Sequence, residues 1–169
     1  MDARISSDEI LNDLRTELIG QECCRLDIRC DKSMFVGFGE KYIPVQKHLK
    51  CCVEFYGFWE LGTYASPWRI HKDQQFFITS ETLGEDIAEV TKDIKLVDTK
   101  LIDIQMLSEF DVRFKFSTGI SLDFLGGFTE DDETLHVLRI GAIWWELKNG
   151  VWSKGQSKYT RDFICYPIH

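Results

Sequence analysis

The fold class follows from one stretch of sequence, VRFKFSTGISLDF at Val112–Phe124. Apolar residues occupy every second position on both sides of a polar turn at Ser117–Gly119, and charged or polar residues stand between them. Successive side chains of a strand point to opposite faces. The pattern therefore predicts a β-hairpin that buries one face and exposes the other.

A second hairpin is predicted at the sequence WWELKNGVW, Trp144–Trp152. Its turn contains Asn149-Gly150, the strongest short-range hairpin signal. Trp144 and Trp145 are adjacent, so on a regular strand they point to opposite faces and only one can enter the core. Exposed tryptophan is typical of interface hot spots. The pair is therefore a candidate partner-binding element.

Alternation of the same kind predicts most of the remaining chain to be β-structure. The strand near the N-terminus has Cys24, Leu26, Ile28 and Cys30 on its apolar face. A turn at His71–Asp73 is expected to join two short extended segments. The remaining expected strands are Met34–Phe38, Leu49–Phe55, Phe76–Thr79, Leu135–Ile140 and an edge strand within Tyr159–Tyr166.

The N-terminus is predicted to form a helix over residues 7–19. Ser6-x-x-Glu9 has the form of a capping box, apolar residues recur at helical spacing, and Gly20 supplies a stop. A weaker pattern from Ile87 to Ile94 predicts a short second helix. Together these elements predict an α+β fold. A helix packs on a curved antiparallel sheet of about eight to ten strands, arranged as a sandwich or a half-barrel.

Length and composition indicate one globular domain over residues 1–169, with a helix in 1–20 and a β-rich body in 22–166. The 169 residues fall within the usual size of one domain, and no linker rich in Pro, Gly or Ser divides them. No apolar run is long enough for a membrane-spanning helix. The acidic, polar N-terminus lacks the order of a signal peptide, so we expect a cytoplasmic protein.

The net charge of −8 disfavours nucleic acid and anionic membranes as partners, because both repel an acidic chain. Among the few grouped cations, Arg25, Arg29 and Lys32 alternate with Asp27 and Asp31. A negative surface instead favours a basic protein partner.

The strongest acidic feature is the run Glu130, Asp131, Asp132 and Glu133 between two expected strands. Two glycines, Gly126-Gly127, precede it and suit a loop that becomes ordered on binding. A solvated loop is the plain interpretation, and a contact for Lys or Arg on another protein is the functional one. We therefore predict that this run and Trp144–Trp145 contact the partner.

Motifs for catalysis or cofactors are missing from the sequence. It has no phosphate-binding glycine loop and no His-x-x-x-His or Cys-x-x-Cys pair. The adjacent pairs Cys23-Cys24 and Cys51-Cys52 would place their sulfurs on opposite strand faces, which is poor geometry for a shared metal. We expect no metal and no cofactor. A Cys–His pair such as Cys51 with His71 or His136 remains open, because catalytic partners meet in space.

In type, the chain resembles the small acidic immunity proteins that accompany bacterial toxins of contact-dependent and polymorphic systems. It shares with them the single-domain size, the net charge, the β-rich body, the acidic run and the lack of a catalytic motif. It is also similar to short bacterial β-rich domains through the segments Trp59–Gly62, Ser66–Ile70 and Phe114–Leu122. The first resemblance implies a protein that covers the active site of one toxin domain, often a basic nuclease.

Three hypotheses of function follow. The first is a non-catalytic protein-binding module, in particular an immunity protein that neutralises a basic toxin. The second is a half-barrel that binds a small molecule in an apolar interior cavity of about 300–1,000 Å³. The third is an enzyme, which requires a histidine or cysteine in a cleft beside carboxylates.

Overall fold

The structure is a computed structural model that describes residues 6–45, 53–64, 66–73, 75–81, 87–127, 133–139, 141–157 and 165–167. Its elements are, in chain order, α1 (Ser7–Leu18), β1 (Cys23–Ile28), β2 (Met34–Pro44), β3 (Tyr56–Thr63), β4 (Trp68–Lys72), β5 (Gln75–Thr79), α3 (Ile87–Asp93), β6 (Leu101–Met106), β7 (Val112–Phe116), β8 (Ile120–Phe124), β9 (Glu133–Arg139), β10 (Ile143–Lys148), β11 (Val151–Gln156) and β12 (Cys165–Pro167).

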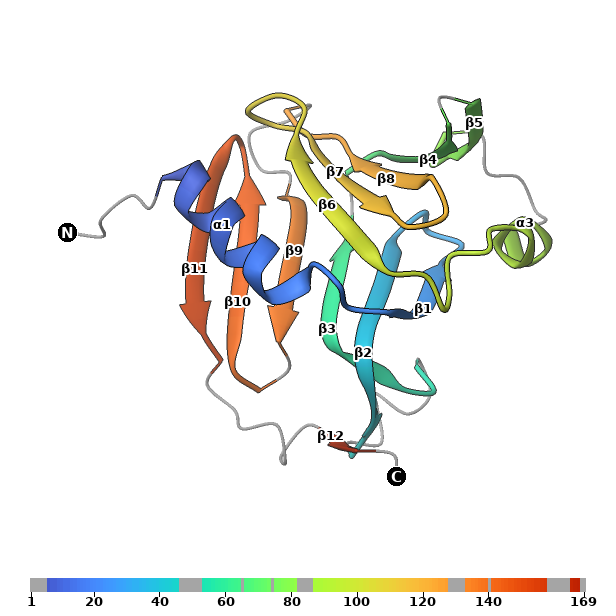
Figure 1. The fold of residues 1–169 in the computed structure, drawn as a ribbon, viewed down its shortest axis with the longest axis horizontal. Coiled ribbons are helices and arrows are strands. Elements are labelled where there is room, and N and C mark those ends of the chain that lie inside the picture. Colours follow the sequence, from blue (N-terminus) through green and yellow to red (C-terminus); the bar gives the residue numbers. More distant parts are fainter. Residues whose placement is uncertain are drawn as a thin grey trace.

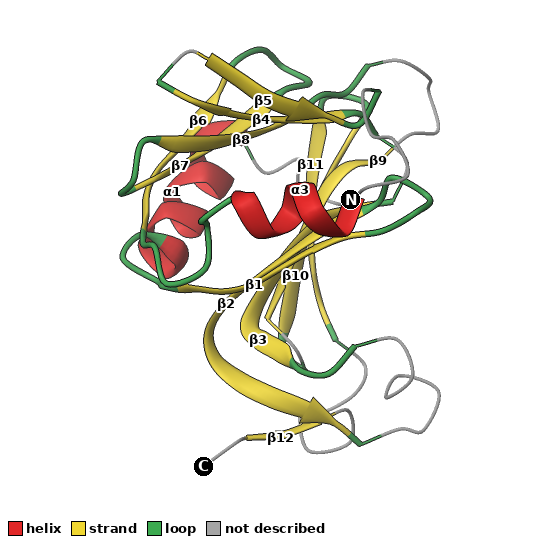
Figure 2. Ribbon diagram, turned by 90° about the vertical axis from the view of Figure 1, so that its right-hand side faces the viewer, coloured by secondary structure: helices red, strands yellow, loops and turns green. Residues whose placement is uncertain are grey.

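The strands form two antiparallel sheets that pack face to face (Figures 1 and 2). The larger sheet has seven strands in the order β1-β2-β3-β9-β10-β11, with β12 paired to β2. The smaller sheet has five strands in the order β5-β4-β8-β7-β6. The predicted α+β sandwich is confirmed, with more strands than the eight to ten expected.

The core lies between the sheets and is filled by the inward side chains of both. Phe38 of β2 stacks on Phe116 of β7 with ring centroids 6.0 Å apart, which joins the two sheets directly. Trp59 of β3 contacts Trp145 of β10 at 5.4 Å within the larger sheet. Burying rings of this size supplies much of the favourable free energy of a domain.

Helix α1 covers the open side between two edge strands, β6 and β11. Its first turn is capped as predicted, with the Glu9 amide donating to Ser6 Oγ at 3.2 Å. Arg15 donates to the carbonyl of Ile104 in β6 at 2.7 Å, and Lys154 of β11 pairs with Asp13 at 2.7 Å. The helix thus protects both edges, which would otherwise invite pairing with other chains. Its buried face consists of Ile10, Leu11, Leu14 and Leu18.

Both predicted hairpins are confirmed, as β7–β8 and β10–β11. Their registers place Val112 opposite Phe124 and Lys148 opposite Val151. In the second turn Asn149 has φ 48° and Gly150 has φ 71°. These left-handed conformations are those that an Asn-Gly hairpin turn requires.

Two strand predictions need correction, and one strand was not predicted. Of the strand expected over Leu49–Phe55, residues 53–55 do not form a strand and residues 49–52 lie outside the described part. The next strand, β3, begins at Tyr56. The apolar face of β1 begins with the buried Cys23, because an irregularity between Cys23 and Arg25 shifts the alternation, and Cys30 is exposed beyond the strand. Strand β6 was not predicted, since an irregularity after Leu101 interrupts its pattern.

The remaining expectations concern the C-terminal strand and membrane spans. Strand β12 covers only Cys165–Pro167, and residues 159–164 of the expected edge strand lie outside the described part. Neither helix that the structure describes has the length and apolar character needed to cross a bilayer.

Candidate binding cleft

The outer face of the larger sheet carries side chains that the strand order brings together from distant parts of the chain. Trp59 and Leu61 of β3 point into the core, so Glu60 between them points outward. The registers extend this position into a row across the sheet, formed by Arg25, Gly37, Glu60, Leu138, Trp144 and Gly155. A second row beside it is formed by Asp27, Phe35, Gly62, His136 and Glu146.

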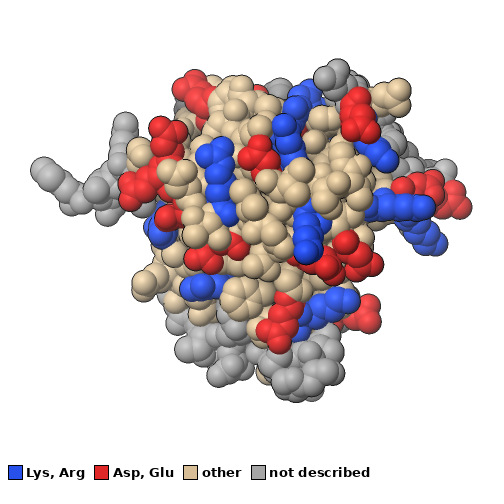
Figure 3. All heavy atoms as spheres, viewed as in Figure 1, with Lys and Arg blue, Asp and Glu red and all other residues tan. Residues whose placement is uncertain are grey.

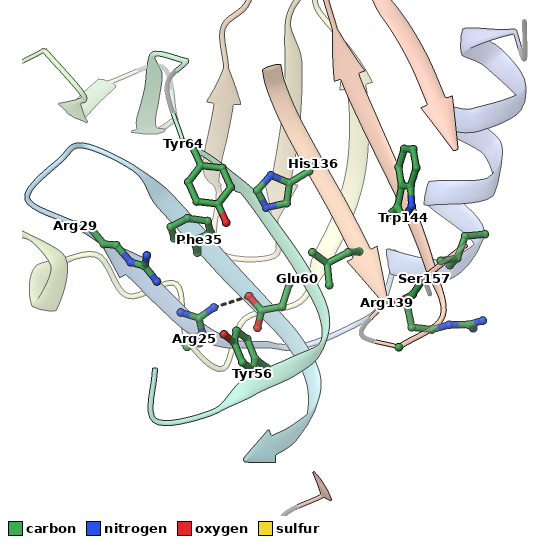
Figure 4. A pocket seen from close by; sticks show the side chains of 13 residues that line it. Arg25, Arg29, Phe35, Tyr56, Glu60, Tyr64, His136, Arg139, Trp144 and Ser157 are labelled. Atoms are coloured by element: carbon green, nitrogen blue, oxygen red, sulfur yellow. Dashed lines mark hydrogen bonds and ion pairs between the residues drawn. The ribbon is translucent and has the colours of Figure 1, made fainter. Parts of the chain in front are cut away.

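A cleft of about 400 Å³ opens over these two rows (Figure 4). Glycines in the rows allow larger side chains to lie flat across the sheet. A Cβ atom at Gly62 would stand 2.5 Å from Cδ1 of Phe35, so the Phe35 ring occupies the space above this glycine. The lining residues are Arg25, Arg29, Phe35, Tyr56, Glu60, Tyr64, His136, Leu138, Arg139, Gly141, Ile143, Trp144 and Ser157.

An ion pair between Arg25 and Glu60 forms the base of the cleft. Arg25 Nη2 donates to Glu60 Oε2 at 2.5 Å, and the Gly57 amide donates to Oε1 at 2.6 Å. The Glu60 side chain is only 5% exposed. Burial raises the pKa of Glu60 above its ordinary value, although Arg25 and the Gly57 amide act against burial. Arg25 Nε is buried as well and has no hydrogen-bond partner among the described residues.

A second arginine lies beside this pair at the end of β1. Asp27 Oδ2 accepts from Arg25 Nη1 at 3.3 Å and from Arg29 Nε at 3.2 Å, so one carboxylate bridges two guanidinium groups. The Arg29 guanidinium lies 4.4 Å from the centroid of the Phe35 ring. Stacking on an aromatic face holds the plane of the guanidinium in a fixed orientation.

The wall of the cleft next to Arg29 is aromatic. Tyr64 stacks on His136 with ring centroids 5.3 Å apart and meets the Phe35 ring edge to face at 5.1 Å. His136 Nδ1 lies 2.6 Å from Glu133 Oε1, which holds the imidazole ring in place. Tyr64 itself is 62% exposed, so its ring forms the rim of the cleft.

The two adjacent tryptophans separate as the alternation predicts. Trp145 is 2% exposed and lies in the core, where its contacts are structural. Trp144 is 36% exposed and lies on the outer face at the other side of the cleft. Its indole ring covers Gly155 of β11 so closely that a Cβ at that position would overlap the ring.

The predicted acidic contact is described only in part. Glu130, Asp131 and Asp132 lie outside the described residues. Glu133 opens β9, and its carboxylate is directed at His136. On the face shown in Figure 3, acidic and basic residues are interspersed among the coloured residues and form no patch of one sign.

None of the described cysteines lines the cleft, although Cys23 and Cys24 directly precede Arg25 in β1. Burial raises the pKa of Cys23 to about 12 and that of Cys24 to about 11, which leaves both thiols protonated at neutral pH. Cys51 and Cys52 lie outside the described part. Within the described ranges no group of three His, Cys, Asp or Glu side chains is placed to hold a metal ion.

Most of the cleft was not identified from the sequence. Of the lining residues, Trp144 was predicted as a contact residue. Arg25, Arg29 and His136 were noted as well, but the two arginines were discounted because acidic residues separate them. One usable signal was Glu60, a carboxylate within the apolar segment Phe58–Leu61. A charge between two buried positions of a strand must face outward or be paired, and here it does both.

Comparison with known proteins adds no relative. The chain matches no family model, and neither the characterised proteins nor the solved structures include a significant match. The functional argument therefore depends on the geometry of the cleft.

Proposed function

We propose that the protein is a non-catalytic protein-binding module that contacts its partner through the outer face of the larger sheet. The observation that carries this proposal is the open cleft framed by Tyr64, 62% exposed, and Trp144, 36% exposed. Tyrosine, tryptophan and arginine are the residue types most enriched in interface hot spots. A sheet face whose only role was contact with water would not need large rings laid across glycines.

In its particular form the proposal is an immunity protein that neutralises a toxin domain in the bacterial cytoplasm. The net charge of −8 supports a partner that is basic overall, since opposite net charges speed association. The association rate should then fall as the salt concentration rises. Growth rescue by co-expression with the toxin encoded beside the gene would test this form.

The binding face is tested with the double variant Tyr64→Ala, Trp144→Ala. Wild type and double variant are used in equal amounts to capture proteins from the native host. The partner that the wild-type protein captures should be missing from the capture by the double variant. The matched control is Ile102→Ala with Leu107→Ala, which removes two side chains that are 52% and 40% exposed at the smaller sheet. Equal capture by wild type and double variant would contradict the proposal.

The stability of the double variant provides an independent check. Tyr64 stacks on His136 and the Trp144 ring covers Gly155, so removing both rings should lower the free energy of unfolding by about 1–3 kcal/mol. Urea unfolding measures this loss and identifies conditions under which the double variant is still folded. Loss of capture under those conditions then reports on the surface and not on folding.

A second candidate function is general acid–base catalysis, and His136 is the observation that favours it. Its imidazole lies in the cleft, and His136 Nδ1 stands 2.6 Å from the acceptor oxygen Oε1 of Glu133, as in sites where a carboxylate orients a base. The described thiols supply no nucleophile there, and Figure 4 shows Ser157 at the far end of the cleft from His136. Turnover of activated esters or phosphodiesters that is abolished in His136→Asn would support catalysis, and no turnover by wild type would contradict it.

The small-molecule alternative is less favoured by the position of the cleft. That hypothesis placed an apolar cavity between the sheets of a half-barrel. The cleft of about 400 Å³ lies instead on the outer face, and rings such as Trp59, Trp68 and Trp145 fill the space between the sheets.

A further inference from the structure

In the cleft, the carboxylate acceptors already have hydrogen-bond partners, whereas several donors do not. Both oxygens of Glu60 already accept hydrogen bonds, from Arg25 and from the Gly57 amide. Glu133 is engaged with His136. The acidic groups that line or border the cleft therefore have internal partners.

Several donors at the same place lack such partners. Arg29 uses only its Nε on Asp27, and its two terminal nitrogens have no hydrogen bond within the described structure. The hydroxyl groups of Tyr56 and Tyr64 likewise have no described hydrogen-bond partner. Figure 4 shows the guanidinium groups of Arg25 and Arg29 and both tyrosine hydroxyls on the same side of the cleft.

This excess of donors indicates a ligand that accepts hydrogen bonds and carries negative charge. The planar fork of a guanidinium matches the two oxygens of a carboxylate. Arg29 is 35% exposed at its side chain, and its stacking on Phe35 fixes the direction of the fork. Phe35 itself is buried beneath this guanidinium, whereas the exposed ring of Tyr64 favours an apolar or aromatic neighbour of the carboxylate.

We propose that the cleft receives an acidic side chain of the partner protein, with its carboxylate on Arg29 and the Tyr64 hydroxyl and an adjacent aromatic residue against the exposed Tyr64 ring. The inference rests on the proposed function and specifies the chemistry of the contact. A partner that is basic overall would thus present a local acidic residue at this position. The net charges would then attract the two proteins, and the contact in the cleft would fix how the partner is oriented on the sheet.

The probe is a capped pentapeptide in which two glutamates flank a tyrosine, titrated into the ¹⁵N-labelled full chain. Amide resonances of Gly62 and Tyr64 should shift on addition of the peptide. Arg29→Gln should weaken binding about tenfold, and Arg29→Lys should weaken it less, because charge remains but the fork is lost. The matched control is Lys115→Gln on the smaller sheet, which removes one positive charge and should leave binding unchanged.

Four outcomes would overturn the inference. The lysine counterpart of the peptide could shift the same resonances as strongly, or Arg29→Gln could bind the glutamate peptide as well as wild type. The third outcome is no shift at millimolar peptide. Benzoate binding as tightly as the peptide would assign the site to a small carboxylate and would also reject a partner side chain.

The proposed function has a separate readout. If Arg29→Gln still captures the native partner while the Tyr64→Ala, Trp144→Ala variant does not, the binding face is correct and the carboxylate contact is wrong. If both variants capture the partner, the binding face itself is wrong.

Discussion

The outer faces of the two sheets each contain a buried carboxylate, but the two carboxylates differ in the number of guanidinium groups that contact them. Each has one buried carboxylate in a cross-strand row, Glu60 on the larger sheet and Asp123 on the smaller one. Asp123 receives Arg69 Nε at 2.6 Å and Arg113 through two hydrogen bonds at 2.6 and 2.8 Å. Glu60 receives one guanidinium, which it shares with Asp27.

The pKa values of the two carboxylates move in opposite directions as a result. Burial raises the pKa of both groups, but at Asp123 the hydrogen bonds from Arg113 and Arg69 outweigh burial and hold the pKa below its ordinary value. At Glu60 burial prevails. On the smaller sheet, two guanidinium groups direct their hydrogen bonds to one carboxylate. On the larger sheet, Glu60 is contacted by one guanidinium, and the terminal nitrogens of Arg29 beside it have no described hydrogen bond.

The largest expected effect is that of Asp123→Asn. Removing the charge leaves Arg69 and Arg113 without their shared anion, and breaking such a pair costs about 3 kcal/mol. Urea unfolding measures this loss. Asp103→Asn on the same sheet, where the carboxylate is partly exposed, should cost less than about 1 kcal/mol. A loss below 1 kcal/mol for Asp123→Asn would show that this network does not hold the smaller sheet together.

The next effect is that of Gly62→Ala on the larger sheet. The new Cβ would stand 2.5 Å from the Phe35 ring and 2.8 Å from the Met34 carbonyl, and the backbone atom cannot move aside. We expect a loss of about 2 kcal/mol. Adding Phe35→Ala should relieve the ring contact, so the double variant should lose less than the sum of the single losses. Unchanged stability of Gly62→Ala would contradict the close approach.

The smallest effect is a difference in pH dependence between Asp123→Asn and Glu60→Gln. The depressed pKa of Asp123 contributes stability above the unfolded pKa of about 3.9, and this is lost as pH falls through the folded value. The raised pKa of Glu60 has the opposite sign, so its stability is present at low pH and lost as pH rises through the folded value.

Unfolding from pH 3 to pH 8 tests both signs. The deficit of Asp123→Asn relative to wild type should shrink toward acid pH. Glu60→Gln should gain relative to wild type as pH rises, by about 1.4 kcal/mol for each tenfold change in proton affinity. Parallel profiles for the two variants would remove the electrostatic distinction between the faces.

Local pattern was sufficient for much of the fold. The hairpins at Val112–Phe124 and Trp144–Trp152 and the capped helix α1 have strong short-range signals, and the structure confirms them. Strand β6 was not predicted, because an irregularity in it interrupts the period of two. The apolar face of β1 was assigned correctly at Leu26 and Ile28, but the irregularity before Arg25 makes Cys23 and not Cys24 its first buried residue.

The cleft shows where such patterns stop. Alternation correctly indicated that Trp144 and Trp145 face opposite ways, although it did not indicate which one enters the core. Nothing local indicated that β3 pairs with β9, which brings Glu60 beside Leu138 across a large separation in sequence. The arginines of β1 were visible, but their shared acid and the stacking on Phe35 were not.

The sequence by itself determined the class of fold, the hairpins, the helix and the acidic net charge, because these depend on composition and on periods of two or 3.6 residues. Only the tertiary structure decided which buried carboxylate is paired with two guanidinium groups and which donors of the cleft lack a described hydrogen-bond partner. That depends on how many guanidinium groups the strand order brings within hydrogen-bond distance of each acid, and strand order is set by long-range packing of the two sheets.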